Sequence, residues 1–279
     1  MAPYSAPDEG SPRILSSPHP PARVFVAETC GRHAILPFGE RSPSDHGPLQ
    51  PGDRVPALVI EVTGERVTLS QAHPGFVARL LEREVPEIRD GTVRIEAIAR
   101  EPGRETKIAL SSDDADLDAI GVCTGDRGSR VLAVTAWVPN ELVSFLDWHP
   151  APAQFVAHAL APTRVHKVYQ DDDAQMLELV IADEDLPRVL AHRAAPLRMA
   201  AQLVGWRLDL LTLGRLEEFR ADLARVQELD AQQVSTLLAY GVRSVESLLE
   251  YDADWIAEVL EIEAGQAAGV IAGAAAHTV

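Results

Sequence analysis

Gly125 and Gly128 frame a four-residue segment whose residue types suit contact with a nucleic-acid backbone. Two glycines let the chain turn tightly and approach a phosphate without a Cβ atom in between. A helix beginning at Ser129 would direct free amides and its dipole at that phosphate. Arg127 and Arg130 would supply positive charge, whereas the carboxylate between the glycines would repel a phosphate. A lone pair of glycines at this spacing is common, so its meaning depends on the elements that hold it.

The elements around this segment are predicted to form a unit that occurs twice. Hydrophobic spacing predicts, in order, a helix, two strands, a helix and a strand over residues 74–84, 93–97, 107–110, 131–138 and 142–148. A short helix is expected just before Gly125, and the same order of elements returns over residues 153–211, at a spacing of about 70 residues. Two short helices joined by G-x-x-G in such a unit predict a KH-type clamp, which holds about four nucleotides.

The chain before the first unit consists of two segments that differ in composition. Residues 1–22 contain six prolines, which predicts an extended, disordered arm. Residues 23–72 contain four short β-like runs punctuated by glycines, which predicts a small β-barrel of the OB type. Within this barrel Phe25, His33 and Phe38 are either a base-stacking platform or ordinary barrel residues.

Several motifs in these predicted units are similar to one family. Residues 84–95 read EVPEIRDGTVRI, residues 97–104 read AIAREPGR, and residues 121–130 read GVCTGDRGSR. They resemble the first KH domain of the bacterial NusA family and its RNA-binding loop. LSQAHP at 69–74 is similar to the junction with an upstream S1-type RNA-binding barrel. AAQLVGWRLD at 200–209 resembles the end of the second KH domain.

The resemblance implies an α+β multidomain fold with an OB-type barrel, two tandem type II KH domains and a C-terminal all-α, helix-hairpin-helix-like domain. The expected segments are 1–22 (arm), 23–72 (abbreviated S1-type barrel), 73–149 (first KH), 150–213 (second KH) and 214–279 (helical). It also implies an RNA-binding factor in transcription elongation, termination and antitermination that contacts nascent single-stranded RNA. The residues expected to bind RNA are Gly125, Arg127, Gly128, Ser129, Arg130, Phe25, His33 and Phe38.

Three departures from the family pattern matter. We expect no counterpart of the N-terminal module that contacts RNA polymerase in the family, since residues 1–22 are too few to form it. The first barrel strand is missing or reduced to residues 13–15. In the second KH unit the loop falls on residues 191–194, where both glycines are absent, and Pro196 removes an amide. We expect this unit to keep its fold and to have lost most of its grip on RNA.

The charge of the chain is strongly negative but uneven. A formal net charge of −17 argues at face value against a nucleic-acid partner. However, residues 214–279 alone hold 12 acidic and 4 basic residues, nearly half of the excess. These helices are therefore expected to contact a protein with a basic surface, either RNA polymerase or another transcription factor. A plain folding cap is the alternative for this segment.

Other functional classes find no support in the sequence. Cys30 and Cys123 cannot form a disulfide framework, and no spacing of histidine, cysteine or carboxylates predicts a metal site. Neither a catalytic motif nor a cofactor motif is present, so an enzyme is not expected. Without an apolar run of about 20 residues, we expect a cytoplasmic protein, and a monomer. The four tryptophans are expected to anchor the cores. The alternative function is a divergent member acting as a protein scaffold or competitor with weak RNA binding.

Overall fold

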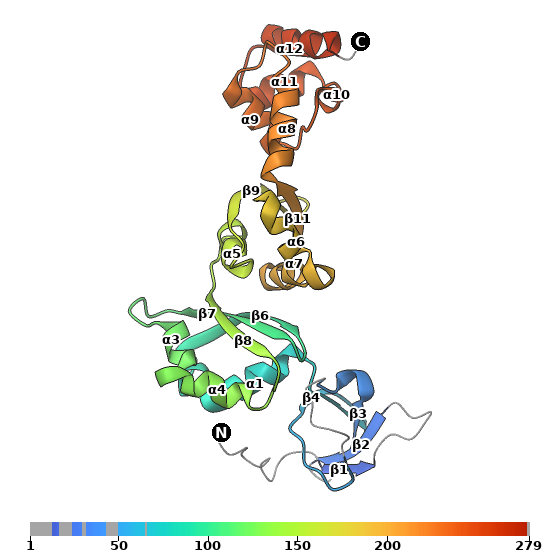
Figure 1. Cartoon of the computed structure of the whole chain (residues 1–279), viewed down its shortest axis with the longest axis vertical. Coiled ribbons are helices and arrows are strands. Elements are labelled where there is room, and N and C mark those ends of the chain that lie inside the picture. Colours follow the sequence, from blue (N-terminus) through green and yellow to red (C-terminus); the bar gives the residue numbers. More distant parts are fainter. Residues whose placement is uncertain (1–12, 17–23, 30–31, 43–49, 65, 278–279) are drawn as a thin grey trace. The chain divides into compact units, whose positions relative to one another are not determined.

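The computed structural model describes residues 13–16, 24–29, 32–42, 50–64 and 66–277. The chain divides into two compact units. Residues 1–161 and 192–205 form the first unit, and residues 162–191 and 206–279 form the second. Figure 1 labels the helices and strands of both.

A five-stranded sheet begins the first unit. Its strands are β1 (Arg13–Ser16), β2 (Val24–Thr29), β3 (Arg32–Pro37), β4 (Leu58–Thr63) and β5 (Arg66–Ser70), with the short helix η1 (Phe38–Glu40) after β3. The strand order is β1-β2-β3-β5-β4, antiparallel except for the parallel pair β3–β5. Leu36 and Leu69 are fully buried in its core.

The strand β1 bears on two expectations. It covers four residues and pairs antiparallel with β2, in agreement with a first strand reduced to residues 13–15. It also lies inside the segment expected to be an arm, so that expectation is wrong for these four residues. Strand pairing satisfies the backbone groups of a short segment whose composition alone predicts disorder. The other residues of that segment lie outside the part of the chain that the structure describes.

The predicted helix–strand unit follows the five-stranded sheet, in the predicted order. Its elements are α1 (Pro74–Glu84), α2 (Pro86–Arg89), β6 (Val93–Glu101), β7 (Glu105–Ser112), α3 (Ala119–Thr124), η2 (Asp126–Gly128), α4 (Ser129–Thr135) and β8 (Leu142–Asp147). The central strand β7 is antiparallel to β6 and parallel to β8. Phe76, Leu80 and Leu81 of α1 are buried with Ile108 and Leu110 of β7, which confirms the predicted apolar face of α1.

A buried ion pair links β6 to the residue that precedes β8, and its arginine also contacts the segment before α1. The guanidinium of Arg100 and the carboxylate of Glu141 are both inaccessible to solvent, with Nε–Oε1 at 2.8 Å and Nη2–Oε2 at 3.0 Å. Arg100 Nη1 also donates to the carbonyls of Gln71 (2.7 Å) and His73 (3.1 Å), just before α1. Arg100 therefore ties the end of the five-stranded sheet to the strand β6.

Lys107 covers the opposite face of the same sheet. It alternates with Ile108, so it lies on the face away from α1. Its Nζ donates to the carbonyls of Ala159 (3.0 Å) and Ala161 (3.1 Å), at the end of α5 (Pro152–Ala159). Burial lowers the pKa of Lys107. The ammonium thus satisfies helix-end carbonyls that α5 leaves without partners of its own.

The second unit contains a three-stranded sheet and the C-terminal helices. The sheet strands are β9 (Val165–Asp171), β10 (Met176–Ile181) and β11 (Arg207–Thr212). Central β10 is antiparallel to β9 and parallel to β11, as in the first sheet. With α5, η3 (Asp183–Asp185), α6 (Leu186–Val189) and α7 (Ala191–Val204), these strands complete the second copy of the predicted order.

The C-terminal helices pack on one face of this sheet. They are α8 (Leu213–Leu223), α9 (Ala231–Ala239), α10 (Val245–Leu248), α11 (Ala253–Leu260) and α12 (Ala264–Ala276). Their core includes Tyr169 and Leu211 of the sheet. Arg243 joins the two layers, because it pairs with Glu178 of β10, lies over the Tyr169 ring (5.5 Å) and donates to the carbonyl of Leu238.

The tryptophans differ from expectation. None of the four is buried, and Trp148 is 36% exposed, so they border the cores rather than anchor them. Leucine, valine and isoleucine fill the interior instead. Within the described residues no single helix has both the length and the apolar character to span a membrane; α11 and α12 meet these criteria only together, across a bend of 113°.

Candidate nucleic-acid interface

The turn between α3 and α4 has a positive φ angle at three positions. The φ angles are 74° at Gly125, 51° at Arg127 and 77° at Gly128, and the Gly128 amide donates to the Gly125 carbonyl at 3.0 Å. A Cβ atom on Gly125 would lie 2.9 Å from the backbone nitrogen of Arg130, so close approach requires glycine there. A Cβ atom on Gly128 would meet nothing closer than 3.7 Å. Gly128 is therefore required by its backbone angle alone.

Two of the predicted basic residues of this turn have different roles. Arg127 is exposed, and among the described residues no carboxylate lies within ion-pair distance of it. Arg130 instead turns back into the protein, where Nη1 donates to Glu87 (2.9 Å) and to the carbonyl of Val122 (2.9 Å). A backbone hydrogen bond and the Arg130 guanidinium lower the pKa of Glu87 although burial opposes them. The guanidinium of Arg130 joins α2 to α3 and α4, and Arg127 is the cation that the turn presents to solvent.

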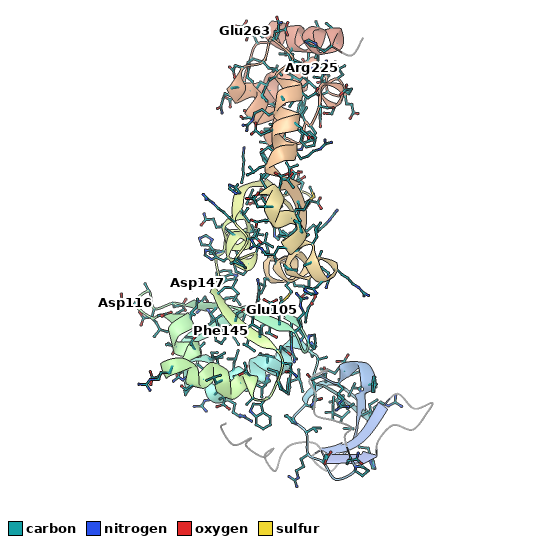
Figure 2. The ribbon with its side chains drawn as sticks, in the orientation of Figure 1. Glu105, Asp116, Phe145, Asp147, Arg225 and Glu263 are labelled. Atoms are coloured by element: carbon teal, nitrogen blue, oxygen red, sulfur yellow. The ribbon has the colours of Figure 1, made fainter. Side chains whose placement is uncertain are left out.

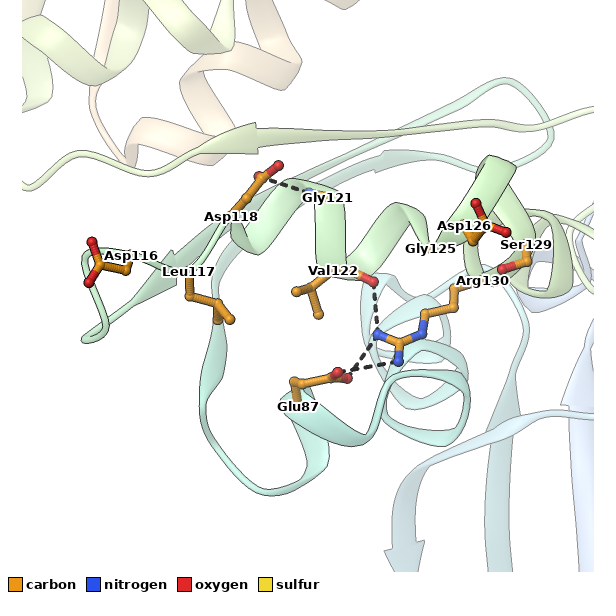
Figure 3. Close-up of a pocket in the computed structure, with 10 residues that line it drawn as sticks. All are labelled: Glu87, Asp116, Leu117, Asp118, Gly121, Val122, Gly125, Asp126, Ser129 and Arg130. Carbon is orange, nitrogen blue, oxygen red and sulfur yellow. Dashed lines mark hydrogen bonds and ion pairs between the residues drawn. The ribbon is translucent and has the colours of Figure 1, made fainter.

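A shallow hollow beside the turn is acidic (Figure 3). Its lining includes four carboxylates, those of Glu87, Asp116, Asp118 and Asp126, against the single cation of Arg130. Asp118 is the N-cap of α3 and accepts a hydrogen bond from the Gly121 amide at 2.8 Å. Figure 2 shows Asp116 projecting from the loop between β7 and α3. A phosphate is therefore repelled from the hollow and attracted only at the Arg127 side of the turn.

Ser129 begins α4, as predicted, and is exposed. Its amide already donates to the carbonyl of Asp126, which closes η2. The Ser129 hydroxyl lies close to where a Cβ atom on Gly125 would be, at 2.8 Å. Ser129 therefore offers a hydroxyl, rather than a backbone amide, to a ligand at this turn.

The corresponding loop in the second copy of the helix–strand order makes a left-handed turn without glycine. His192, Arg193 and Ala194 have φ angles of 51°, 60° and 57°. Left-handed backbone costs a non-glycine residue about 1–2 kcal/mol, so tertiary contacts must maintain this loop. Arg198 supplies two, because it donates to the Arg193 carbonyl and pairs with Glu101 of the first sheet. Sequence spacing gives no signal for this pairing.

The three barrel candidates are only partly brought together. His33 is exposed and lies opposite Glu28 in the β2–β3 ladder. Phe38 begins η1 and is 60% exposed. Phe25 pairs with Leu36 in the same ladder, and its side chain lies outside the described part of the structure. Both readings, stacking platform and ordinary surface of the sheet, remain predictions.

The described residues show neither a metal centre nor an exposed thiol. Across the described ranges no group of three histidine, cysteine or carboxylate side chains is placed to hold a metal ion. Cys123 is fully buried, and burial raises the pKa of its thiol to about 12.

Comparison with known proteins identifies the two helix–strand units. The model of the NusA-like first KH domain matches residues 71–148, and that of the NusA-like second KH domain matches residues 152–218. Together these matches cover about half of the chain.

Among the relatives, three examples carry the name transcription termination/antitermination protein NusA. The chain is 35% identical over 191 residues to that of Bacillus subtilis, covering 67% of this chain and 51% of the relative. It is 33% identical to that of Halalkalibacterium halodurans (76% and 59% covered) and 38% identical to that of Mycobacterium tuberculosis (66% and 54% covered). The chain thus spans little more than half the length of these relatives.

Proposed function

Because the chain belongs to the NusA family, we propose that it is an RNA-binding factor acting in transcription elongation, termination or antitermination. Its ligand is nascent single-stranded RNA, bound at the turn between α3 and α4 of the first KH domain. The relatives named above are termination/antitermination proteins, and both KH models match this chain. The observation that carries the proposal is the turn itself, with two glycines at positive φ and an exposed arginine between them.

The turn can bind about four nucleotides through a small number of groups. Arg127 pairs with a phosphate, and the Ser129 hydroxyl donates to a phosphate or sugar oxygen. Gly128 lets the RNA backbone approach because it has no side chain. The flanking carboxylates keep affinity low. We therefore expect weak binding that depends on salt through very few ionic contacts.

A titration of labelled single-stranded RNA tests this role. Arg127→Gln should weaken binding several-fold and reduce the slope of log affinity against log salt by about 0.7, the value for one phosphate contact on a single strand. Gly128→Asp and Gly128→Asn are a matched pair, since both residues tolerate left-handed backbone and differ only in charge. The aspartate variant should bind more weakly than the asparagine variant.

Gly125 is the wrong position for this test, because any side chain there collides with the Arg130 backbone. Unchanged affinity and unchanged salt slope in both Arg127→Gln and Gly128→Asp would refute RNA binding at this turn.

The neighbouring parts supply the rest of the proposed function. We propose that the five-stranded sheet is an S1-type OB barrel in which His33, Phe38 and Phe25 stack on bases. The helices of residues 214–277 are proposed to form a helix-hairpin-helix-like domain that contacts RNA polymerase or another transcription factor. Their charge supports a protein partner over RNA.

A scaffold or competitor with weak RNA binding is the second candidate function. It is favoured by the acidic hollow beside the first turn. It is also favoured by the ion pair of Arg130 with Glu87, because this pair leaves Arg130 less able to bind RNA. The loss of both glycines from the second loop also favours it. Affinity capture from lysate with and without nuclease distinguishes the two, because partners held through RNA disappear on nuclease treatment and direct protein partners remain.

A further inference from the structure

Three aromatic rings form a cluster on the C-terminal helices. Tyr240 ends α9, Tyr251 lies between α10 and α11, and Trp255 is in α11 (Figure 1). Tyr251 and Trp255 are stacked, with ring centroids 3.9 Å apart and an interplanar angle of 18°. Tyr240 meets Trp255 edge-on at 6.0 Å. Tyr240 is 58% exposed and the other two rings are half-buried, so the cluster presents aromatic surface to solvent.

The side chains around this cluster are acidic and exposed. Glu250 and Asp252 flank Tyr251 in sequence, and Asp254 and Glu258 flank Trp255 on α11. The backbone nitrogen of Trp255 donates to Asp252 at 2.8 Å, which fixes the start of α11. Exposed carboxylates therefore flank Tyr251 and Trp255 along the chain.

The protein leaves these carboxylates without cations. Residues 226–277, all of them described, contain nine aspartates and glutamates, none of which takes part in an ion pair. The same stretch has one arginine, Arg243, which is held by Glu178 of the sheet. One of these carboxylates is that of Glu263, which Figure 2 labels at the start of α12. Like charges concentrated on one surface destabilise a fold unless a partner neutralises them.

The chemistry of this surface selects its ligand. Nucleic acid is excluded, because phosphates would meet only carboxylates. A purely apolar ligand would leave the charges unmatched. An arginine side chain satisfies both features, since its planar guanidinium stacks on aromatic rings and donates paired hydrogen bonds to carboxylates. Lysine provides the charge without the planar stack.

We propose that the cluster of Tyr240, Tyr251 and Trp255, with its flanking carboxylates, binds an arginine-bearing segment of a partner protein. This deepens the proposed protein contact of the C-terminal helices and rests on that proposal, but not on RNA binding by the KH turn. The guanidinium lies against Tyr240, the most exposed ring, and its donors reach Glu250 or Asp254.

The test uses the full chain and two labelled peptides, one alternating arginine with glycine and one alternating lysine with glycine. Fluorescence anisotropy at low salt should show tighter binding of the arginine peptide, by about two- to five-fold. Tyr240→Ala should weaken the arginine peptide by a similar factor. Leu190→Ala, which removes another exposed apolar side chain of the same unit, is the control and should leave binding unchanged.

Charge variants distinguish binding at this surface from nonspecific electrostatic attraction of a basic peptide to an acidic chain. Glu250→Gln/Asp254→Asn should weaken arginine-peptide binding more than Glu217→Gln/Glu218→Gln, which removes the same charge from carboxylates that already pair with arginines of α8. Equal weakening by the two double variants, or equal binding by wild type and Tyr240→Ala, would overturn the proposal.

The same variants are titrated with the labelled single-stranded RNA. RNA affinity should not fall in Tyr240→Ala, whereas a fall would assign the cluster to RNA and overturn the proposal. A failure of the Arg127 and Gly128 variants to affect RNA would refute the KH proposal and leave this one standing.

Discussion

Replacing Glu141 with a neutral residue should strongly lower the stability of the first KH domain, although Glu141 lies in the connection between α4 and β8. Its carboxylate is fully buried and accepts hydrogen bonds from Arg100, from the Gly103 amide (2.9 Å) and from the Thr106 hydroxyl. Glu141→Gln keeps the size of the side chain but leaves the Arg100 guanidinium charged, buried and uncompensated. Breaking a buried pair in this way costs about 3–5 kcal/mol.

This cost should be visible as a lower melting temperature of the first unit. For a unit of this size, 1 kcal/mol shifts the midpoint by about 2–4 °C, so a fall of about 6–20 °C is expected. Urea unfolding of the full chain, with hydrogen exchange read at the amides of β6–β8, measures the change where it occurs. The double variant Arg100→Met/Glu141→Gln should cost clearly less than the two single variants added together, because it leaves no buried charge.

A matched control lies in the same sheet. Arg94 and Asp113 also form a bidentate ion pair, but both side chains are exposed. Asp113→Asn should therefore destabilise much less than Glu141→Gln, because water replaces the lost partner. If the two variants cost the same, burial is not what makes the Arg100–Glu141 pair important, and the reasoning fails.

The same carboxyl predicts a pH dependence. Burial alone would raise the pKa of Glu141, but the hydrogen bonds from Arg100 and Thr106 and the Arg100 charge hold it below the ordinary value. A depressed folded-state pKa gives stability that is complete above the unfolded pKa, about 4.3, and is lost as pH falls through the folded pKa. The stability gap between wild type and Glu141→Gln should be constant above about pH 5.5 and shrink in acid. A gap that stays constant down to pH 3 would contradict this assignment.

Three further outcomes follow, one from the buried thiol of Cys123 and two from the cations of Lys107 and Arg243. In a Cys30→Ser background, Cys123 should react with a disulfide reagent at pH 8 about a thousand-fold more slowly than in urea, because burial raises its pKa to about 12; fast native reaction would contradict the burial. Lys107→Met should speed hydrogen exchange at the end of α5, since two carbonyls lose their donor, whereas Lys107→Arg should retain part of the protection. Arg243→Met should loosen the helices from the second sheet, seen as faster proteolysis within 213–277, while RNA affinity at the first turn stays unchanged; proteolysis at the wild-type rate would show that Arg243 is not the link.

Local sequence determined the elements and the turn. Alternation and helical spacing are set by residues two to four positions apart, so the order of helices and strands is predictable in both units. The glycines of the first turn are equally local, because positive φ at Gly128 and the close approach at Gly125 need residues without Cβ. The sheet core and the apolar face of α1 follow from the same periodicity.

Tertiary structure decided the roles of the charged and aromatic side chains. In the sequence Arg130 looks like an RNA-binding residue, but in the fold its guanidinium pairs with Glu87, 43 residues away. Arg100 finds Glu141 across 41 residues, and Arg243 finds Glu178 across 65. The pairing of such side chains depends on how whole elements pack, which no spacing rule encodes. The strand β1 and the left-handed second loop have the same origin, since long-range contacts stabilise backbone that local preference disfavours. By itself the sequence predicted a glycine-flanked turn on a repeated fold, and the folded chain determined which charged side chains around that turn pair within the protein and which are exposed.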